Sequence, residues 1–208
     1  MFPISHFNIT RTPFYYYDKT LLSNTLAKLI RLAGERNYHV HYAVKANANP
    51  EILKLIAASG IGADCVSGGE IKAALEAGFP AKKIVFAGVG KADWEIEYAL
   101  EKKIFCFNVE SAEELSVIEE LAKKKENIAS IALRINPNID AHTHEYITTG
   151  LSENKFGIPI EMLDSIFSQI QRSPHVQLVG FHFHIGSQIL NLETFHVLCE
   201  RILSLIHI

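Results

Sequence analysis

The chain has 208 residues, of which 48% are hydrophobic, and this is enough apolar material for the core of one large globular domain. Twenty Lys and Arg against 23 Asp and Glu give a net charge of −3, so no basic excess favours nucleic acid or an anionic membrane surface. No signal peptide or long uncharged apolar run stands out, and the three cysteines are widely spaced. We therefore expect a cytoplasmic protein with reduced thiols that acts on a small molecule and binds neither nucleic acid nor membrane.

The predicted elements begin with a helix over 19–36. Short runs rich in β-forming residues then alternate with longer segments of helical spacing, which is typical of repeated βα units. The predicted strands are 39–45, 61–66, 84–87, 104–108, 130–136 and 177–184. The helices predicted between them are 50–59, 69–77, 93–102, 112–124 and 159–171.

Repeated βα units imply parallel strands, which form either an open doubly wound sheet or a closed eight-stranded barrel. The sequence KANANP, rather than a glycine-rich dinucleotide fingerprint, follows the first predicted strand, so we favour the barrel. Six units are two fewer than the eight of a TIM barrel. The prediction is therefore an α/β fold with a partial (β/α)8 barrel.

Several polar side chains stand near the C-terminal ends of the predicted strands. Because side chains alternate along a strand, the apolar residues of each strand should face the helices and the intervening residues should face the barrel interior. This counting predicts that Lys45, Asp64, Asn108, Arg134 and His184 meet at the C-terminal mouth, where barrel enzymes have their active sites. A strand register that is wrong by one residue would reverse the result.

Three stretches resemble motifs of one enzyme family. YAVKAN at 42–47 is similar to the segment around the cofactor lysine of the fold-type III pyridoxal-phosphate decarboxylases, which have alanine-racemase-like barrels. HIGSQ at 184–188 resembles their cofactor-contacting motif on a later strand. RINPNIDAHTHEYITTGLSENKFGI at 134–158 is similar to the loop of the diaminopimelate decarboxylases. The resemblance covers roughly residues 10–203, and the order and spacing of the three motifs make it specific.

The resemblance implies pyridoxal 5′-phosphate as cofactor and Lys45 as the catalytic residue whose amine bonds to the cofactor aldehyde. It also implies that His184 lies against the pyridine ring and that Ser187 contacts the phosphate. Gly186 would let the backbone approach closely. Asp64 and Arg134 match positions that surround the lysine and the cofactor. An alternative is that these two form a buried ion pair that supports the barrel.

The segment 136–156 is longer than an ordinary connection and follows the fifth strand, so we interpret it as a lid or substrate loop. His142 and His144 lie within it, but no acidic or cysteine partner stands at ligand spacing. His182 and His184 share one strand face, where we expect a core histidine and a ring-stacking histidine. We therefore expect no metal site.

The resemblance also defines the expected domain organisation. We expect an N-terminal segment with its leading helix over 1–36 and an incomplete cofactor-binding βα barrel over 37–203. Family members are about twice as long, so the C-terminal β-domain and the remaining barrel strands are expected to be missing, and a homodimer is expected only at full length. The final residues no longer resemble the expected helix, so 202–208 is interpreted as a non-native tail.

The predicted function is decarboxylation of meso-diaminopimelate to L-lysine and CO2 in lysine biosynthesis, with little or no activity in this fragment. Decarboxylation of ornithine, arginine or carboxynorspermidine is the neighbouring alternative, and the 134–158 segment argues against it. Alanine racemase is disfavoured because its lysine motif differs after VKA. A non-catalytic relative that binds pyridoxal phosphate, or an inert fragment, is the alternative from outside the enzyme class.

Overall fold

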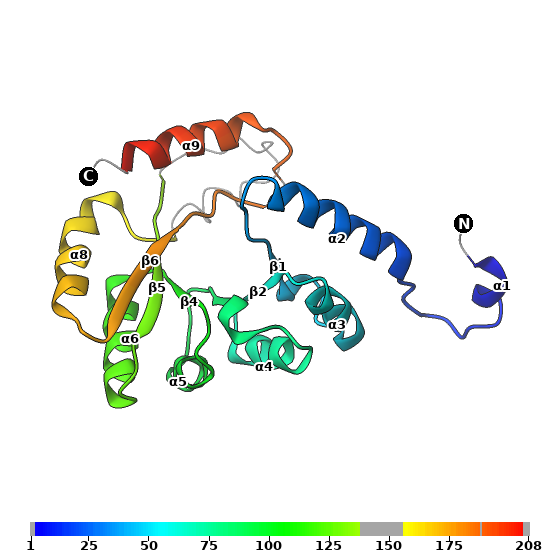
Figure 1. Cartoon of the computed structure of the whole chain (residues 1–208), viewed down its shortest axis with the longest axis horizontal. Coiled ribbons are helices and arrows are strands. Elements are labelled where there is room, and N and C mark those ends of the chain that lie inside the picture. Colours follow the sequence, from blue (N-terminus) through cyan, green and yellow to red (C-terminus); the bar gives the residue numbers. More distant parts are fainter. Residues whose placement is uncertain (1–2, 138–155, 188, 206–208) are drawn as a thin grey trace. The chain divides into compact units, whose positions relative to one another are not determined.

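The structure is a computed structural model that describes residues 3–137, 156–187 and 189–205 of the chain. The chain divides into two compact units, Met1–Val40 and His41–Ile208 (Figure 1). The first unit contains the short helix α1 (Ile4–Phe7) and the long helix α2 (Lys19–Gly34). The Asp18 carboxylate accepts a hydrogen bond from the Leu21 backbone N–H at 2.9 Å, and this N-cap fixes where α2 begins.

The second unit is built on a six-stranded parallel sheet with the strand order β1-β2-β3-β4-β5-β6. Each strand therefore lies beside the next one in the chain, as repeated βα units require. The strands are β1 (His41–Ala43), β2 (Gly62–Cys65), β3 (Ile84–Phe86), β4 (Cys106–Val109), β5 (Ala129–Arg134) and β6 (Val176–His182).

Helices connect the strands and cover one face of the sheet. Figure 1 shows the strands along an arc with these helices on its outer side. They are α3 (Pro50–Ala58), α4 (Gly68–Glu76), α5 (Asp93–Lys102), α6 (Ala112–Lys124) and α8 (Leu163–Arg172), and α9 (Glu193–Leu205) follows the last strand. Three single 3₁₀ turns are also present: η1 (Val44–Ala46), η2 (Ala81–Lys83) and η3 (Ile160–Met162).

Polar side chains cap three of these helices at their N-termini. The side-chain oxygen of Asn49 accepts hydrogen bonds from the first turn of α3, and the hydroxyls of Ser67 and Ser111 do the same for α4 and α6. Each cap satisfies backbone N–H groups that have no partner inside the helix. The second asparagine of KANANP is therefore explained by the fold, since it starts α3 directly after the first strand.

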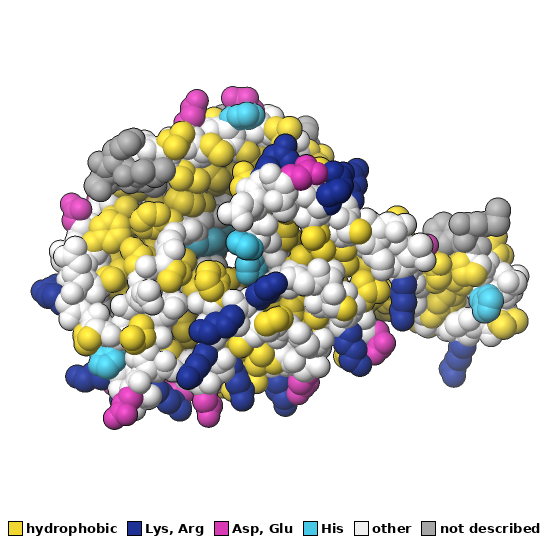
Figure 2. Space-filling model, viewed as in Figure 1, with side chains coloured by type: hydrophobic (Ala, Val, Ile, Leu, Met, Phe, Trp, Pro, Cys, Tyr) yellow, Lys and Arg dark blue, Asp and Glu magenta, His cyan; other side chains and the backbone are white. Residues whose placement is uncertain are grey.

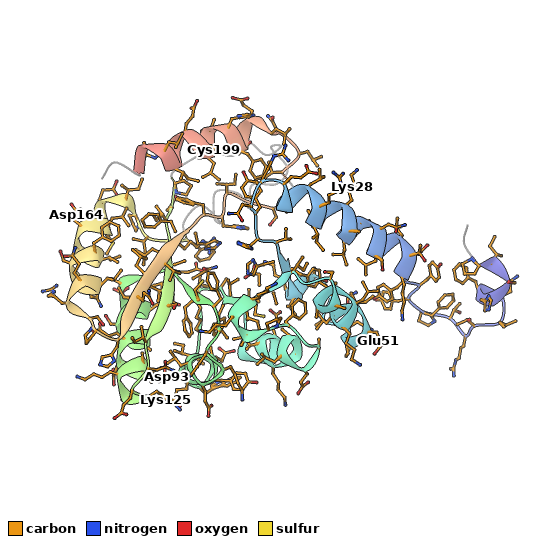
Figure 3. All side chains as sticks on the ribbon, in the orientation of Figure 1. Lys28, Glu51, Asp93, Lys125, Asp164 and Cys199 are labelled. Carbon is orange, nitrogen blue, oxygen red and sulfur yellow. The ribbon has the colours of Figure 1, made fainter. Side chains whose placement is uncertain are left out.

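The core lies between the sheet and its helices, where side chains from both fill the intervening layer (Figure 3). Ile131, Leu133 and Ile135 are at most 1% exposed and form its centre along β5. The sheet is less well covered at β6, where Val179 and Phe181 are both 42% exposed. Figure 2 shows hydrophobic side chains gathered on the surface over β6, α8 and α9. The burial pattern therefore weakens from the centre of the sheet towards its β6 edge.

The sequence prediction of six βα units in a parallel sheet is confirmed, and helices α5 and α6 have the predicted bounds. One prediction about a strand is wrong in detail. β1 ends at Ala43, because the backbone enters the 3₁₀ turn η1 two residues before Lys45. Among the described residues, no helix combines the length and the apolar character needed to cross a membrane.

Candidate functional site

The C-terminal ends of the six strands all lie at one edge of the sheet, because the strands are parallel. Lys45 follows the end of β1, Asp64 lies near the end of β2, and Arg134 is the last residue of β5. Asn108 stands one residue before the end of β4, and His184 follows β6 by two residues. The predicted residues therefore reach the same edge, although Lys45 and His184 come from the segments after the strands and not from the strands themselves.

Lys45 lies in the turn η1 with an exposed side chain. Since the residue is outside β1, strand alternation does not decide its direction, and that part of the sequence argument is wrong. Its neighbour on the next strand is set by the register instead, which pairs Ala43 with Asp64. The positive charge of Lys45 acts on the Asp64 carboxylate and lowers its pKa. The turn therefore places the amine next to the acid at the mouth.

Asp64 is half-buried, and its Oδ1 atom has no hydrogen-bond partner within the described part of the chain. Burial raises the pKa of this carboxyl group above its usual value, the charge of Lys45 opposes the shift, and the charge of Glu70 adds to it. A desolvated oxygen without a partner is costly, so it marks a place where a bound polar group would be stabilised.

Arg134 forms its ion pair with a residue that the sequence did not indicate. Its Nη1 atom donates a hydrogen bond to Oε2 of Glu110 at 2.5 Å, and the side chains are 10% and 5% exposed. Glu110 directly follows β4. The alternative in which Asp64 and Arg134 pair with each other is therefore wrong. The guanidinium carbon of Arg134 also lies 5.8 Å from the centre of the Phe156 ring, a cation–π contact.

A buried lysine lies beside this pair. Nζ of Lys91 donates hydrogen bonds to the carbonyls of Gly88 and Asn108, at 2.7 and 2.9 Å, and to Oε1 of Glu114 at 2.6 Å. Its side chain is 1% exposed. Sequence reasoning missed Lys91, because a lysine in the loop after β3 resembles a solvated loop charge. It missed Glu114 because SAEE resembles a helix N-terminus, which it is as well.

Asn108 has a structural role at this edge. Its side chain is buried, and its Oδ1 atom accepts a weak hydrogen bond from the Cys106 thiol, at 3.9 Å between sulfur and oxygen. Its carbonyl accepts the hydrogen bond from Lys91. The prediction that Asn108 points inward agrees with its burial, and its groups bind the protein itself.

The histidines follow each other at the end of β6. His182 is paired in register with Arg134, and its Nδ1 atom is buried without a hydrogen-bond partner among the described residues. Burial lowers the pKa of His182 to about 4, and the charges of Arg134, His184 and Lys91 act in the same direction. His182 is therefore neutral at pH 7. His184, two residues further on, is half-buried.

The chain turns sharply after His184. Ile185 is buried, Gly186 has a φ of 131°, and Ser187 is exposed. That φ lies in a region that residues with a Cβ rarely adopt, which explains the glycine in HIGSQ. His142 and His144 fall outside the described residues, as does most of the 136–156 segment interpreted above as a lid. The described residues contain no group of three or more His, Cys, Asp or Glu that could hold a metal ion.

These residues fit the cofactor implied by the sequence resemblance. An exposed primary amine at Lys45 can bond to an aldehyde, and the carboxylate of Asp64 lies beside it. The buried Asp64 Oδ1 and His182 Nδ1 atoms are two polar atoms that a bound polar ring could satisfy. The residues that would hold pyridoxal phosphate here are Lys45, Asp64, His184, Gly186 and Ser187.

Comparison with known proteins gives close relatives. The chain is 58% identical over 203 residues to a diaminopimelate decarboxylase from Bacteroides thetaiotaomicron, which covers 97% of this chain and 53% of the relative. A diaminopimelate decarboxylase from Campylobacter jejuni is 44% identical over 185 residues, which covers 89% of this chain and 46% of the relative. The chain thus spans about half the length of the curated relatives that it matches.

Solved structures give the same result for the fold. The crystal structure of diaminopimelate decarboxylase from Helicobacter pylori complexed with L-lysine superposes with a TM-score of 0.82 at 43% identity, covering 98% of this chain and 53% of that one. The enzyme from M. jannaschii superposes with a TM-score of 0.89 at 36% identity, covering 98% and 49%. The six βα units therefore correspond to about half of these enzymes.

Residues 23–208 match the family described as pyridoxal-dependent decarboxylase, pyridoxal binding domain. The match spans most of the chain and includes all six strands, Lys45 and the HIGSQ motif. Pyridoxal phosphate is the cofactor of this family, which agrees with the exposed lysine and the two polar atoms without partners at the strand ends. The chain belongs to the pyridoxal-dependent decarboxylases and contains their pyridoxal-binding domain.

Proposed function

We propose that this chain is the cofactor-lysine half of an enzyme that decarboxylates meso-diaminopimelate to L-lysine and CO2. The observation that carries the proposal is the position of Lys45, exposed at the mouth of the sheet beside Asp64, in a chain that is 58% identical to a diaminopimelate decarboxylase. Similarity over the whole chain makes a shared substrate class the simplest interpretation.

Each residue at the mouth has a proposed task. The Lys45 amine bonds to the cofactor aldehyde and is displaced by the amino group of the substrate. The conjugated ring of the bound cofactor accepts the electrons left behind when CO2 departs. The His184 imidazole supports one face of that ring, and the Ser187 hydroxyl donates to the phosphate.

Two further residues would tune this site. Asp64 keeps a negative charge beside Lys45 and holds the amine in place. Gly186, at a φ of 131°, lets the backbone reach the phosphate without a clash from a side chain. Arg134 has its charge matched by Glu110, so we propose that it shapes the mouth next to the cofactor rather than providing an unpaired charge.

The substrate is proposed from the relatives. The Helicobacter pylori enzyme, 43% identical, was crystallised with L-lysine, which is diaminopimelate without one carboxylate and therefore the expected product. Ornithine and arginine are shorter or differently charged at the far end. The similarity of the 134–158 segment to the loop of diaminopimelate decarboxylases also favours diaminopimelate.

The remaining expectations concern the whole enzyme. We propose that it works in the cytoplasm as a homodimer, and that the 208-residue chain alone has little or no activity, because it corresponds to about half of each relative. The proposed arrangement is an N-terminal segment over 1–36 followed by an incomplete barrel over 37–203, with 202–208 as a non-native tail.

A chimera tests the proposed reaction. Residues 1–201 are joined to the C-terminal half of the Bacteroides thetaiotaomicron relative, and CO2 release is measured from meso-diaminopimelate, ornithine and arginine with pyridoxal phosphate present. We expect release from meso-diaminopimelate by the chimera and none by its Lys45→Ala variant, while Lys54→Ala, which changes an exposed lysine on α3, stays active. Cofactor uptake without turnover of any of the three would instead indicate a non-catalytic relative.

A further inference from the structure

Lys91 is a lysine with almost no contact with solvent and three hydrogen bonds. It lies between β3 and α5, and its side chain is 1% exposed. Two of its acceptors are backbone carbonyls of different loops, Gly88 at 2.7 Å and Asn108 at 2.9 Å. The third is the Glu114 carboxylate at 2.6 Å. All three N–H groups of the ammonium are therefore used, which is the condition for keeping such a charge buried.

The contacts of Lys91 continue to the neighbouring loop. Oε1 of Glu114 accepts from Lys91, and Oε2 accepts from the backbone N–H of Glu110 at 2.8 Å. Burial raises the pKa of Glu114, and the charge and hydrogen bond of Lys91 oppose that shift. Glu114 therefore relies on Lys91 to remain a carboxylate that holds the backbone of Glu110.

Glu110 is then fixed at both of its oxygens. Oε1 accepts from the Gly88 backbone N–H at 3.2 Å, and Oε2 accepts from Nη1 of Arg134 at 2.5 Å. Gly88 thus binds Glu110 through its N–H and Lys91 through its carbonyl. The route from Lys91 to Arg134 runs through Glu114, Glu110 and Gly88, and every step is a printed contact between buried or half-buried groups.

The four charges of this cluster cancel. Lys91 and Arg134 are positive, and Glu110 and Glu114 are negative, so the cluster adds no net charge to the mouth. Burying four charges has a large desolvation cost, and an apolar cluster of the same size is often as stable or more so. What the cluster provides and an apolar group does not is a fixed direction for a guanidinium.

We infer that Lys91 is a positioning residue that holds Arg134 in one orientation at the cofactor mouth, acting through Glu114 and Glu110. The part of this inference that concerns the cofactor rests on the function proposed above. Arg134 is held on its other side by the Phe156 ring, and the Gly157 backbone lies against the Arg134 carbonyl. With Lys91 in place, the guanidinium has contacts on both sides and one direction left.

The first test asks whether Lys91 fixes Arg134, without any cofactor. The paired substitution Lys91→Met with Glu114→Gln removes both charges together, so that neither is left buried alone. The matched control is Lys124→Met with Glu120→Gln, which removes an exposed pair at a similar distance of 2.7 Å on α6. Arg134 is modified with an arginine-specific dicarbonyl reagent, and the rate is read by peptide mass spectrometry.

We expect Arg134 to react about tenfold faster in the Lys91 variant, the factor that corresponds to loss of one charged hydrogen bond, and at the original rate in the control. The thiol of Cys65, which is 0% exposed, is labelled in parallel to detect general unfolding. A faster reaction of Arg134 with Cys65 still protected supports the inference. Equal Arg134 rates in both pairs, or parallel exposure of Cys65, would overturn it.

The second test asks whether the orientation matters for the cofactor. The dissociation constant of pyridoxal phosphate is measured for the original chain, the Lys91 pair, Arg134→Met and the combination. If Lys91 acts through Arg134, the Lys91 pair weakens binding about tenfold alone and has no further effect once Arg134 is gone. Losses that multiply independently contradict the inference. A chain that takes up no cofactor refutes the proposed function, and the dicarbonyl rates still decide the role of Lys91.

Discussion

Nη1 of Arg134 and Oε2 of Glu110 are 2.5 Å apart, and both side chains are at least nine-tenths buried. The pair joins the end of β5 to the residue that follows β4, so it closes the mouth between two neighbouring strands. It also explains why Asp64 lacks this arginine as a partner and keeps an oxygen without a hydrogen bond in the described part of the chain.

The Arg134→Met substitution should lower the free energy of unfolding by roughly 3–5 kcal/mol, because it leaves the Glu110 carboxylate buried without its partner. Urea unfolding followed by circular dichroism measures this. Arg31→Met, which removes an exposed ion pair with Glu35, should change the same quantity by less than about 1 kcal/mol.

The double variant Arg134→Met with Glu110→Gln gives the control for this reading. The amide removes the uncompensated charge and still accepts the Gly88 N–H, so most of the lost stability should return. A double variant as unstable as Arg134→Met alone would show that the pair is not the cause.

The stability of the chain should depend on pH through His182. Its pKa is about 4 in the folded protein and 6.5 in a solvated chain, so the unfolded state binds the proton first. The stabilising contribution is therefore complete above pH 6.5 and is lost as the pH falls towards 4. By linkage this amounts to about 3 kcal/mol at most.

His182→Gln should remove that part of the pH dependence, and unfolding curves between pH 4 and 7 measure it. His196→Gln, which changes an exposed histidine on α9, is the control and should keep the original dependence. The same slope in the His182 variant and the original chain would mean that the imidazole is not desolvated as described.

Gly157 is expected to resist substitution. Its φ is 95°, and a Cβ atom there would lie 3.0 Å from the Arg134 carbonyl and 3.2 Å from the Asn136 N–H nitrogen. Gly157→Ala should therefore cost about 1–3 kcal/mol in the free energy of unfolding. Gly90→Ala is the matched control, because a Cβ at Gly90 meets no atom within 4 Å. Equal effects of the two substitutions would argue against the close approach to β5.

The three thiols should differ in reactivity. Burial raises the pKa of Cys65 to about 12 and that of Cys106 to about 11, whereas Cys199 is exposed on α9 (Figure 3). Because the thiolate is the reactive form, iodoacetamide at pH 8 should label Cys199 and spare the other two. Peptide mass spectrometry reads the result, and denaturation in urea should expose all three. Rapid labelling of Cys65 in the folded chain would contradict the burial of β2.

Sequence reasoning predicted the elements well because the local signals agree. The apolar spacing of α6, its Ser111 cap and its terminal lysines all point to the same helix, and the structure has it at the predicted bounds. Strand counting was less successful at Lys45, because three residues of β1 give way to a 3₁₀ turn that no periodic pattern announces.

The partners of the charged residues could not be predicted for a different reason. Whether Arg134 pairs with Asp64 or with Glu110 depends on which loops meet in the fold, and both acids stand near strand ends in the sequence. Lys91 was missed because burial, which distinguishes it from other loop lysines, is a tertiary property. A loop lysine next to glycine and between two buried strands is the signal that could have drawn attention to it.

The central claim is that Lys45 is the residue that holds pyridoxal phosphate, and borohydride reduction tests it most directly. The 208-residue chain is incubated with pyridoxal phosphate and reduced, and the modified lysines are mapped by peptide mass spectrometry. Reduction fixes the cofactor on the lysine to which it had bonded. We expect the modification at Lys45, with little on exposed lysines such as Lys54 and none in Lys45→Ala. Modification spread over the exposed lysines, with Lys45 no higher than the rest, would contradict the claim.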